Sequence, residues 1–155
     1  MIVICHSAGH YSHIITSRVK YIKSDITLLA RIMRAEALGE GEVGMLLVGN
    51  VVVNRVLAQC GPFKKIKTIE QAVYQKKQFE GVGTPLFNKS PTSNEKKLAQ
   101  KCLDYYTKWP ARKALFFKNP GKNVPCPKTF FGPLIGRYKR HCFFGPEGDA
   151  SKCKI

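Results

Sequence analysis

Apolar residues recur at helical spacing through the first two thirds of the chain. The stretch LLARIMRAEAL places Leu29, Ile32 and Glu36 on one stripe, so we expect an amphipathic helix there. Ser24 can cap the start of this helix, and Gly39 can end it. The next stretch, EVGMLLVGNVVVNRVLAQCG, is apolar on nearly every side and is long enough to form a buried helix.

Two capping boxes predict further helices. TIEQ at 68–71 predicts a short helix at 69–75, and TSNE at 92–95 predicts a longer one. We expect an apolar stripe on the longer helix, which Pro110 would close; it consists of Leu98, Cys102, Tyr105, Tyr106 and Trp109. The stretch at 76–88 between the two helices is expected to be a loop.

The last third of the chain changes character. ALFFKNP, TFFGPLIG and RHCFFGP are short, aromatic and punctuated by Gly and Pro, which predicts two or three strands of a small antiparallel sheet. Helices first and strands last indicate the α+β class. Neither an internal repeat nor a linker is evident, so we expect one domain at 24–155 preceded by an N-terminal extension at 1–23.

Composition suits a globular domain with an anionic partner. The chain has 155 residues, of which 44% are hydrophobic, and a net charge of +16. We find no run of about 18 apolar residues and no basic region ahead of the first apolar patch, so we expect neither a membrane span nor a secretory signal. No nucleic-acid-binding motif is evident, and an anionic cell-wall polymer or a merely solvated basic surface explains the charge equally well.

Cysteine and histidine give weaker signals. None of the six cysteines lies in a C-x-x-C pair, so we expect no zinc ribbon; Cys60, Cys126, Cys142 and Cys153 could form disulfides if the protein acts outside the cytosol. Three histidines are spaced so that they would share one face of a helix, namely His6, His10 and His13. We interpret these histidines as part of a polar arm rather than as a metal site. We expect no metal or cofactor.

Glu36 lies where an acid is not expected. Burial disfavours the charged form of a carboxyl group and raises its pKa, which is how glycosidases keep a general acid protonated. Glu40, four residues on, would be its neighbour on a continuous helix and would raise the pKa further. The alternative is that Glu36 turns toward solvent at the helix end, or pairs with Arg34 or Arg55.

Four blocks in order carry a family resemblance: RAEALGEGEVGMLLVGNVVVNR, YQKKQFEGV, ALFFKNP and RYKRHCFF. From about residue 25 to the end, the chain resembles the SleB/CwlJ family of cell-wall hydrolases of the bacterial spore cortex, in its short CwlJ-type form. The resemblance implies a lysozyme-like core related to lytic transglycosylases, with Glu36 as the catalytic acid. It also implies cleft or supporting residues, namely Glu40, Asn54, Gln78, Phe79, Asn119 and His141.

The implied activity is cleavage of peptidoglycan glycan strands in spore germination, between muramic acid and glucosamine. A lytic transglycosylase needs only one catalytic carboxyl group, so we favour that reaction. Hydrolysis remains an alternative, because Glu40 could serve as the second carboxyl group that it requires. The family implies a location at the boundary of spore coat and cortex with a coat partner protein; a phage lysin released through a holin is the alternative. A wall amidase, a non-catalytic wall-binding or coat protein and a nucleic-acid binder remain as rivals.

Overall fold

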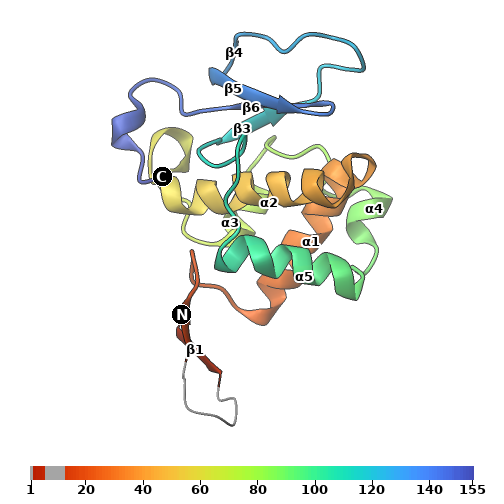
Figure 1. Ribbon diagram of the computed structural model, residues 1–155, viewed down its shortest axis with the longest axis vertical. Helices are drawn as coiled ribbons and strands as arrows, with labels where there is room; N and C mark the ends of the chain where they lie inside the picture. Colours follow the sequence, from red (N-terminus) through yellow and green to blue (C-terminus); the bar gives the residue numbers. More distant parts are fainter. Residues whose placement is uncertain (1, 6–12) are drawn as a thin grey trace.

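The computed structural model describes residues 2–5 and 13–155, with the helices before the main sheet (Figure 1). The helices are α1 (Lys23–Ala37), α2 (Gly41–Ala58), α3 (Ile69–Tyr74), α4 (Pro85–Asn88) and α5 (Ser93–Asp104). The strands are β1 (Ile2–Cys5), β2 (His13–Thr16), β3 (Phe116–Lys118), β4 (Thr129–Phe130), β5 (Gly132–Tyr138) and β6 (His141–Phe144). The predicted α+β class, a helical core with a small C-terminal antiparallel sheet, is confirmed.

The main sheet has the strand order β3-β6-β5-β4, and every neighbouring pair is antiparallel. It has four strands because Phe131, at a φ of 61°, turns the chain between β4 and β5. Phe117 pairs with Phe143, and Phe116 pairs with Phe144, so the aromatic runs predicted as strands lie side by side. A separate two-stranded sheet is formed by β1 and β2.

The core forms where α1, α2 and α5 pack against one another. Leu29, Ile32 and Met33 of α1 are fully buried, as the helical spacing predicts. Gly49 of α2 permits the close approach, because a Cβ atom there would lie 2.7 Å from the sulfur of Cys102 and 2.8 Å from that of Met33. The predicted capping box begins α5, where Thr92 accepts from the Glu95 backbone N–H. At α3, Thr68 accepts from the Gln71 N–H as predicted, but the Gln71 side chain accepts from the Lys67 N–H and not from that of Thr68.

The start of α1 differs from the prediction. Ile22, not Ser24, occupies the cap position, and the Asp25 carboxylate accepts a hydrogen bond of 2.9 Å from the Ile22 backbone N–H. The acid therefore satisfies the helix end that Ser24 was expected to cap. Val19 and Tyr21 are buried, so the packed part of the chain begins a few residues before the helix.

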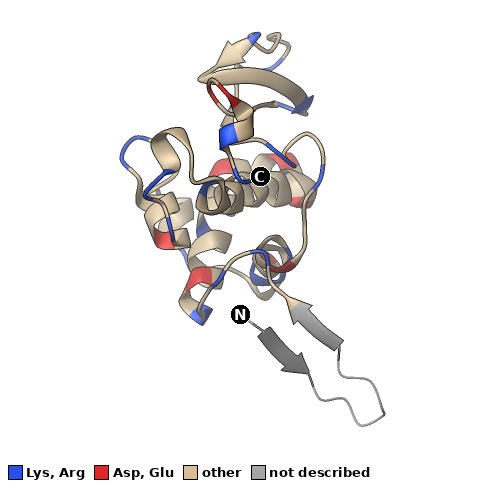
Figure 2. Cartoon of the chain, turned by 90° about the vertical axis from the view of Figure 1, so that its left-hand side faces the viewer, with Lys and Arg blue, Asp and Glu red and all other residues tan. Residues whose placement is uncertain are grey.

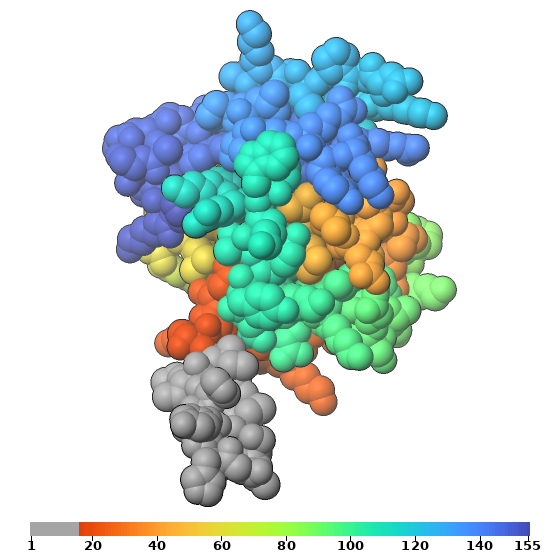
Figure 3. Space-filling model, in the orientation of Figure 1, coloured from red at the N-terminus to blue at the C-terminus, as the bar shows by residue number. Residues whose placement is uncertain are grey.

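The end of α5 also differs, because the helix stops at Asp104 rather than at Pro110. Tyr105 and Trp109 are 62% and 67% exposed, so they do not extend the apolar stripe. The chain instead leaves the helix and crosses α2 on its way to β3, along the face seen in Figure 3. The predicted loop at 76–88 likewise contains one helical turn, α4, which Thr84 caps.

Two buried amides of α2 hold this crossing segment. Asn50 donates to the Tyr106 carbonyl at 3.2 Å and accepts from the Lys108 N–H at 3.1 Å. Asn54 donates to the carbonyls of Ala111 and Ala114, both at 2.9 Å. Its oxygen accepts from the guanidinium of Arg18 at 2.8 Å. These contacts give both buried amides backbone partners and a structural role.

Two disulfides join the cysteines that the sequence offered for pairing. Cys60 binds Cys153 across 93 residues, and Cys126 binds Cys142 across 16. Cys142 is therefore not a free thiol in this structure. The predicted histidine set falls on His6 and His10, which lie outside the described residues, and on His13, whose side chain is not described either.

By length and composition alone, the run Lys23–Ala58 is apolar enough to cross a membrane. Because 78% of its apolar window is buried inside the protein, the run has the character of a core helix pair. Basic side chains are distributed over helices and sheet alike, and acids are few and mostly helical (Figure 2).

Candidate active site

A cavity of about 680 Å³ lies where the C-terminal part of α1 meets the loop before α4 and the sheet. Glu36 reaches it from α1, Arg55 from α2, and His141 from β6. The loop contributes Lys77, Gln78, Glu80 and Gly81, and the region of β3 and β4 contributes Phe116, Phe117, Lys118, Asn119, Phe130 and Phe131. A carboxyl group, a guanidinium and an imidazole thus share one aromatic-walled space.

Glu36 is the half-buried acid of this cavity. Its Oε1 accepts a hydrogen bond of 2.6 Å from the Gly81 backbone N–H. Burial raises the pKa of the Glu36 carboxyl above its ordinary value, and the negative charge of Glu80 adds to the increase. The Gly81 hydrogen bond and the positive charge of Arg55 oppose that increase in pKa. The net effect favours a carboxyl group that retains its proton nearer to neutral pH.

Gly81 permits this contact because it has no side chain. A Cβ atom at residue 81 would lie 2.8 Å from both Oε1 of Glu36 and the Cβ of Ala35. The loop backbone can therefore approach α1 closely enough for its N–H to bind the carboxylate. This arrangement fixes one oxygen of Glu36 and leaves the acid directed into the cavity.

Arg55 is a cation buried beside this acid. It is 2% exposed, and its guanidinium lies over three aromatic rings: Phe63 at 4.9 Å, Phe79 at 4.6 Å and Phe116 at 5.5 Å. Nε donates to the Leu115 carbonyl at 2.8 Å, whereas Nη1 has no hydrogen-bond partner among the described residues. Burial lowers the pKa of Arg55 to about 9, and the nearby Glu36 opposes this decrease.

Arg34, the other basic residue considered as a partner of Glu36, is engaged elsewhere. It forms a buried ion pair of 3.0 Å with Glu95 and donates to the carbonyls of Leu86, Lys89 and Ser90. Arg34 therefore ties α1 to the segment between α4 and α5. The electrostatic environment of Glu36 is set by Arg55 and Glu80 instead.

Glu40 is not the neighbour that a continuous helix would have made it. Because α1 ends at Ala37 and the next three residues form a 3₁₀ turn, the four-residue spacing no longer places both acids on one face. The Glu40 carboxylate accepts from the Arg140 backbone N–H at 3.0 Å, outside the cavity. The second carboxylate at the cavity is the exposed Glu80.

The cavity brings together four of the seven residues proposed from sequence: Glu36, Gln78, Asn119 and His141. His141 is 4% exposed, and its Nδ1 has no partner among the described residues. Burial lowers the pKa of His141, although the negative charge of Glu40 opposes this, so the imidazole is neutral near pH 7. A neutral imidazole can accept a hydrogen bond from a polar ligand at one nitrogen and donate one to it from the other.

The three remaining residues lie outside the cavity lining. Phe79 lies behind it, against the Arg55 guanidinium and with its ring 6.0 Å from that of Phe117. Asn54 holds the segment that crosses α2, and Glu40 lies at the end of α1. Phe116 and Phe117 both border the cavity, although neighbouring residues of a strand point to opposite faces of the sheet.

Among the members of the cavity that sequence reasoning missed, Arg55, Glu80 and Gly81 act directly on Glu36. Arg55 was considered only as an ion-pair partner, yet a cation inside VVVNRVLA was a signal for a buried, functional charge. Glu80 and Gly81 lie in a loop and carry no periodic signal. Among the described residues there is no cluster of three metal-ligating side chains at the cavity or elsewhere.

Comparison with known proteins identifies the family of this chain. Residues 39–144 match the family model described as Cell Wall Hydrolase, a match that begins just after Glu36. "Cell wall hydrolase CwlJ" of Bacillus subtilis (strain 168) is 39% identical over 132 residues, covering 84% of this chain and 92% of that protein. The protein of the same name from Halalkalibacterium halodurans is 43% identical over 130 residues, covering 83% and 90%.

Two solved structures share the fold. The catalytic domain of the germination-specific lytic transglycosylase SleB from Bacillus anthracis superposes with a TM-score of 0.64 at 22% identity, covering 80% of this chain and 96% of that domain. The catalytic domain of Bacillus cereus SleB gives 0.65 at 23% identity, covering 82% and 95%. On the family match and the relatives together, the chain belongs to the Cell Wall Hydrolase family.

Proposed function

We propose that this protein cleaves the glycan strands of peptidoglycan during spore germination, with the cortex as its substrate. The names of its relatives, a cell wall hydrolase and a germination-specific lytic transglycosylase, support the substrate class. The observation that carries the chemistry is the Glu36 carboxyl, half-buried in an aromatic-walled cavity with its pKa raised by burial. A carboxyl group in this state can donate a proton to a glycosidic oxygen.

Glu36 acts first as an acid and then as a base. It gives its proton to the glycosidic oxygen as the bond from that oxygen to the anomeric carbon breaks. The 6-hydroxyl of the muramic acid residue then forms a bond to the same carbon, and its proton passes to Glu36. The products are a 1,6-anhydro end and a free glucosamine end, with no water consumed.

Arg55 supports the second half of this cycle. Once Glu36 has given up its proton, it is a carboxylate in a partly buried site, and the adjacent positive charge stabilises that form. Glu80 has the opposite effect, because its negative charge favours the protonated form. Glu80 therefore favours the protonated form that acts as the acid, and Arg55 favours the carboxylate that acts as the base.

The rest of the cavity suits a sugar chain. Phe117 presents an aromatic ring of the kind on which sugar faces stack, and Gln78 and Asn119 carry amides that can bind hydroxyl groups. The ring of Phe117 meets that of His141 edge-on at 5.2 Å, which fixes the orientation of the imidazole. We assign these four residues to substrate binding, and Phe79 to support of Arg55.

The setting we propose is the spore. Two disulfides are typical of proteins that act outside the reducing cytosol, and the curated relatives described above are bacterial. We place the protein at the boundary of coat and cortex, held there by a coat protein. Purified spores fractionated into coat and cortex, and probed for this chain, would test that location.

The decisive experiment digests purified cortex with wild-type protein and with Glu36→Gln. We expect the wild type to release ends that are one water lighter than hydrolysed muramic acid, and the variant to release none while keeping its fold. Unchanged release by the variant would contradict the role of Glu36. Ordinary reducing ends would indicate hydrolysis, and free amines without new sugar ends would indicate an amidase. Glu80→Gln is the companion variant, because transglycosylation needs no second carboxylate and cleavage should persist.

A further inference from the structure

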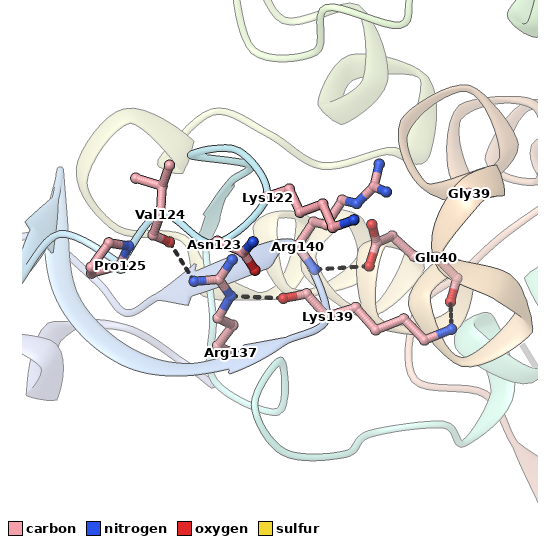
Figure 4. Close-up of a pocket in the computed structure, with 9 residues that line it drawn as sticks. All are labelled: Gly39, Glu40, Lys122, Asn123, Val124, Pro125, Arg137, Lys139 and Arg140. Atoms are coloured by element: carbon pink, nitrogen blue, oxygen red, sulfur yellow. Dashed lines mark hydrogen bonds between the residues drawn. The ribbon is translucent and has the colours of Figure 1, made fainter.

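A second hollow, of about 640 Å³, opens beside the cavity of Glu36. Its walls come from the 3₁₀ turn Leu38–Glu40 that follows α1, from the loop after β3 and from the hairpin of β5 and β6 (Figure 4). Four of its lining residues are cationic, namely Lys122, Arg137, Lys139 and Arg140, and one is acidic, Glu40. We call this hollow the basic pocket.

The positive charge of the basic pocket is not neutralised within the protein. Among the described residues none of its four cations forms an ion pair. The single acid, Glu40, is buried, and one of its carboxylate oxygens is already occupied by the Arg140 backbone N–H. Lys122 and Arg140 are exposed and reach the pocket from two different segments (Figure 4). Four cations facing one engaged acid form an environment for an anion.

The other two cations build the pocket rather than remain available to a ligand. Arg137 donates to the carbonyls of Lys139 and Val124, at 2.7 and 2.5 Å, and so ties the loop to the hairpin. Lys139 donates from Nζ to the backbone oxygen of Glu40 at 3.0 Å, which ties the hairpin to the end of α1. The disulfide between Cys126 and Cys142 fixes the same loop to β6. The walls are therefore held in place before any ligand arrives.

The basic pocket lies next to the cavity because the same elements line both. Arg140 precedes His141 in the hairpin, and Glu40 lies in the 3₁₀ turn that directly follows the helix of Glu36. His141 and Glu36 line the cavity, whereas Arg140 and Glu40 line the basic pocket. A polymer bound with a sugar linkage at Glu36 can therefore place its side groups in the basic pocket.

We propose that the basic pocket binds the carboxylate groups of the peptides attached to the glycan strand, with Lys122 and Arg140 as the contacting cations. This proposal rests on the proposed function, since it names the part of that substrate which the pocket recognises. An arginine and a lysine side by side provide charge-assisted hydrogen bonds to carboxylate oxygens. The pocket would then favour strands that still carry their peptides over bare glycan.

The test compares two purified glycan substrates, both free of teichoic acid, of which one keeps its peptides and one has had them removed by an amidase. The measured quantity is the ratio of kcat/KM on peptide-bearing strands to kcat/KM on bare strands. For the double variant Lys122→Ala/Arg140→Ala we expect this ratio to fall about fivefold, the loss expected for two exposed charge pairs. Added salt should lower the wild-type ratio in the same direction.

The matched control is Lys96→Ala/Lys97→Ala, which removes two exposed charges from α5, on the side of α2 away from the sheet (Figure 1). Its ratio should equal that of the wild type. An unchanged ratio in the Lys122/Arg140 variant would overturn the pocket assignment alone, and so would an equal fall of the ratio in the control variant. A wild-type protein that cuts neither substrate would overturn the proposed function as well.

Discussion

The backbone N–H of Gly81 donates a hydrogen bond of 2.6 Å to Oε1 of Glu36, at a position where a Cβ atom would lie 2.8 Å from that same oxygen. The loop before α4 and the C-terminal turn of α1 thus approach one another closely only because residue 81 has no side chain. The contact orients the acid and opposes the increase in its pKa caused by burial. The position of the acid therefore depends on a residue that takes no part in the chemistry.

Gly81→Ala should accordingly reduce glycan cleavage. The added methyl group pushes either the loop or the Glu36 side chain away, and a displacement of about 1 Å at a catalytic group costs on the order of 100-fold in rate. The measurement is kcat on purified cortex, together with circular dichroism to establish that the fold persists. Gly145→Ala is the matched control, because its nearest contact would be an ordinary 3.6 Å from Ile135. Equal loss in both variants would contradict the role given to Gly81.

Replacing the acid should change the pH dependence of stability. Because the pKa of Glu36 is raised in the folded protein, the folded state holds this proton more tightly than the unfolded state does. Stability therefore decreases as pH rises from the ordinary value of 4.5 through the raised pKa. Glu36→Gln removes that loss.

We expect the free energy of unfolding of Glu36→Gln to exceed that of the wild type at pH 7 and to converge with it below pH 4.5. Urea denaturation at a series of pH values measures this difference directly. Glu42→Gln, a change to an exposed acid at the start of α2, serves as the control. A variant less stable than the wild type at pH 7 would mean that the carboxylate is favoured in the fold, against the stated cause of the pKa shift.

Charge at residue 55 should set the alkaline limit of activity. Cleavage requires the protonated form of Glu36, so the rate decreases as pH rises through its pKa. The positive charge of Arg55 lowers that pKa, so Arg55→Met should move the alkaline limb of the pH–rate profile, where the rate falls, to higher pH. The same change should reduce the maximum rate. Arg55→Lys keeps the charge but loses the planar contact with the Phe79 ring at 4.6 Å.

We therefore expect the lysine variant to lose rate while its alkaline limb stays near that of the wild type. The pH profile of kcat on cortex separates charge from packing, since a merely structural role for Arg55 would lower the rate at every pH without moving the limb. A limb that stays at the wild-type pH in Arg55→Met would contradict the electrostatic role.

The sequence was informative wherever a single segment determines the environment of a residue. The stripe of Leu29 and Ile32 was enough to carry Glu36 toward the interior, because a helix imposes its period on every side chain. The capping boxes at Thr68 and Thr92 placed two helix starts for the same local reason. The order of helices before strands was sufficient for the fold class.

Relationships between distant segments could not be read in this way. Arg55 is enclosed by Phe63, Phe79 and Phe116, which come from three separate elements, and no spacing reveals that they meet. Glu40 was misplaced because the helix ends at Ala37, and an early end changes the face on which every later residue lies. Thr84 followed by Pro85 was in fact a readable start for α4, since proline suits the first turn of a helix.

The two disulfides should differ in what their removal costs. Cys60–Cys153 closes a loop of 93 residues, so Cys60→Ser/Cys153→Ser should lower the free energy of unfolding by about 5 kcal/mol by the chain-entropy relation. Cys126–Cys142 closes only 16, which corresponds to about 3 kcal/mol. Urea midpoints at 25 °C, compared with the oxidised wild type, measure both losses.

The loss of activity should rank the two disulfides in the order opposite to the loss of stability. Cys142 adjoins His141 of the cavity, and Cys126 fixes the loop that carries Lys122, so Cys126→Ser/Cys142→Ser should reduce kcat/KM on cortex more than the other pair does. The bond between Cys60 and Cys153 contributes no residue to either hollow. Its removal should leave the rate near that of the wild type at temperatures where the variant is still folded. If the Cys60–Cys153 variant lost more rate than the Cys126–Cys142 variant under those conditions, the prediction would be wrong. The C-terminal segment would then influence the site although it lines neither hollow.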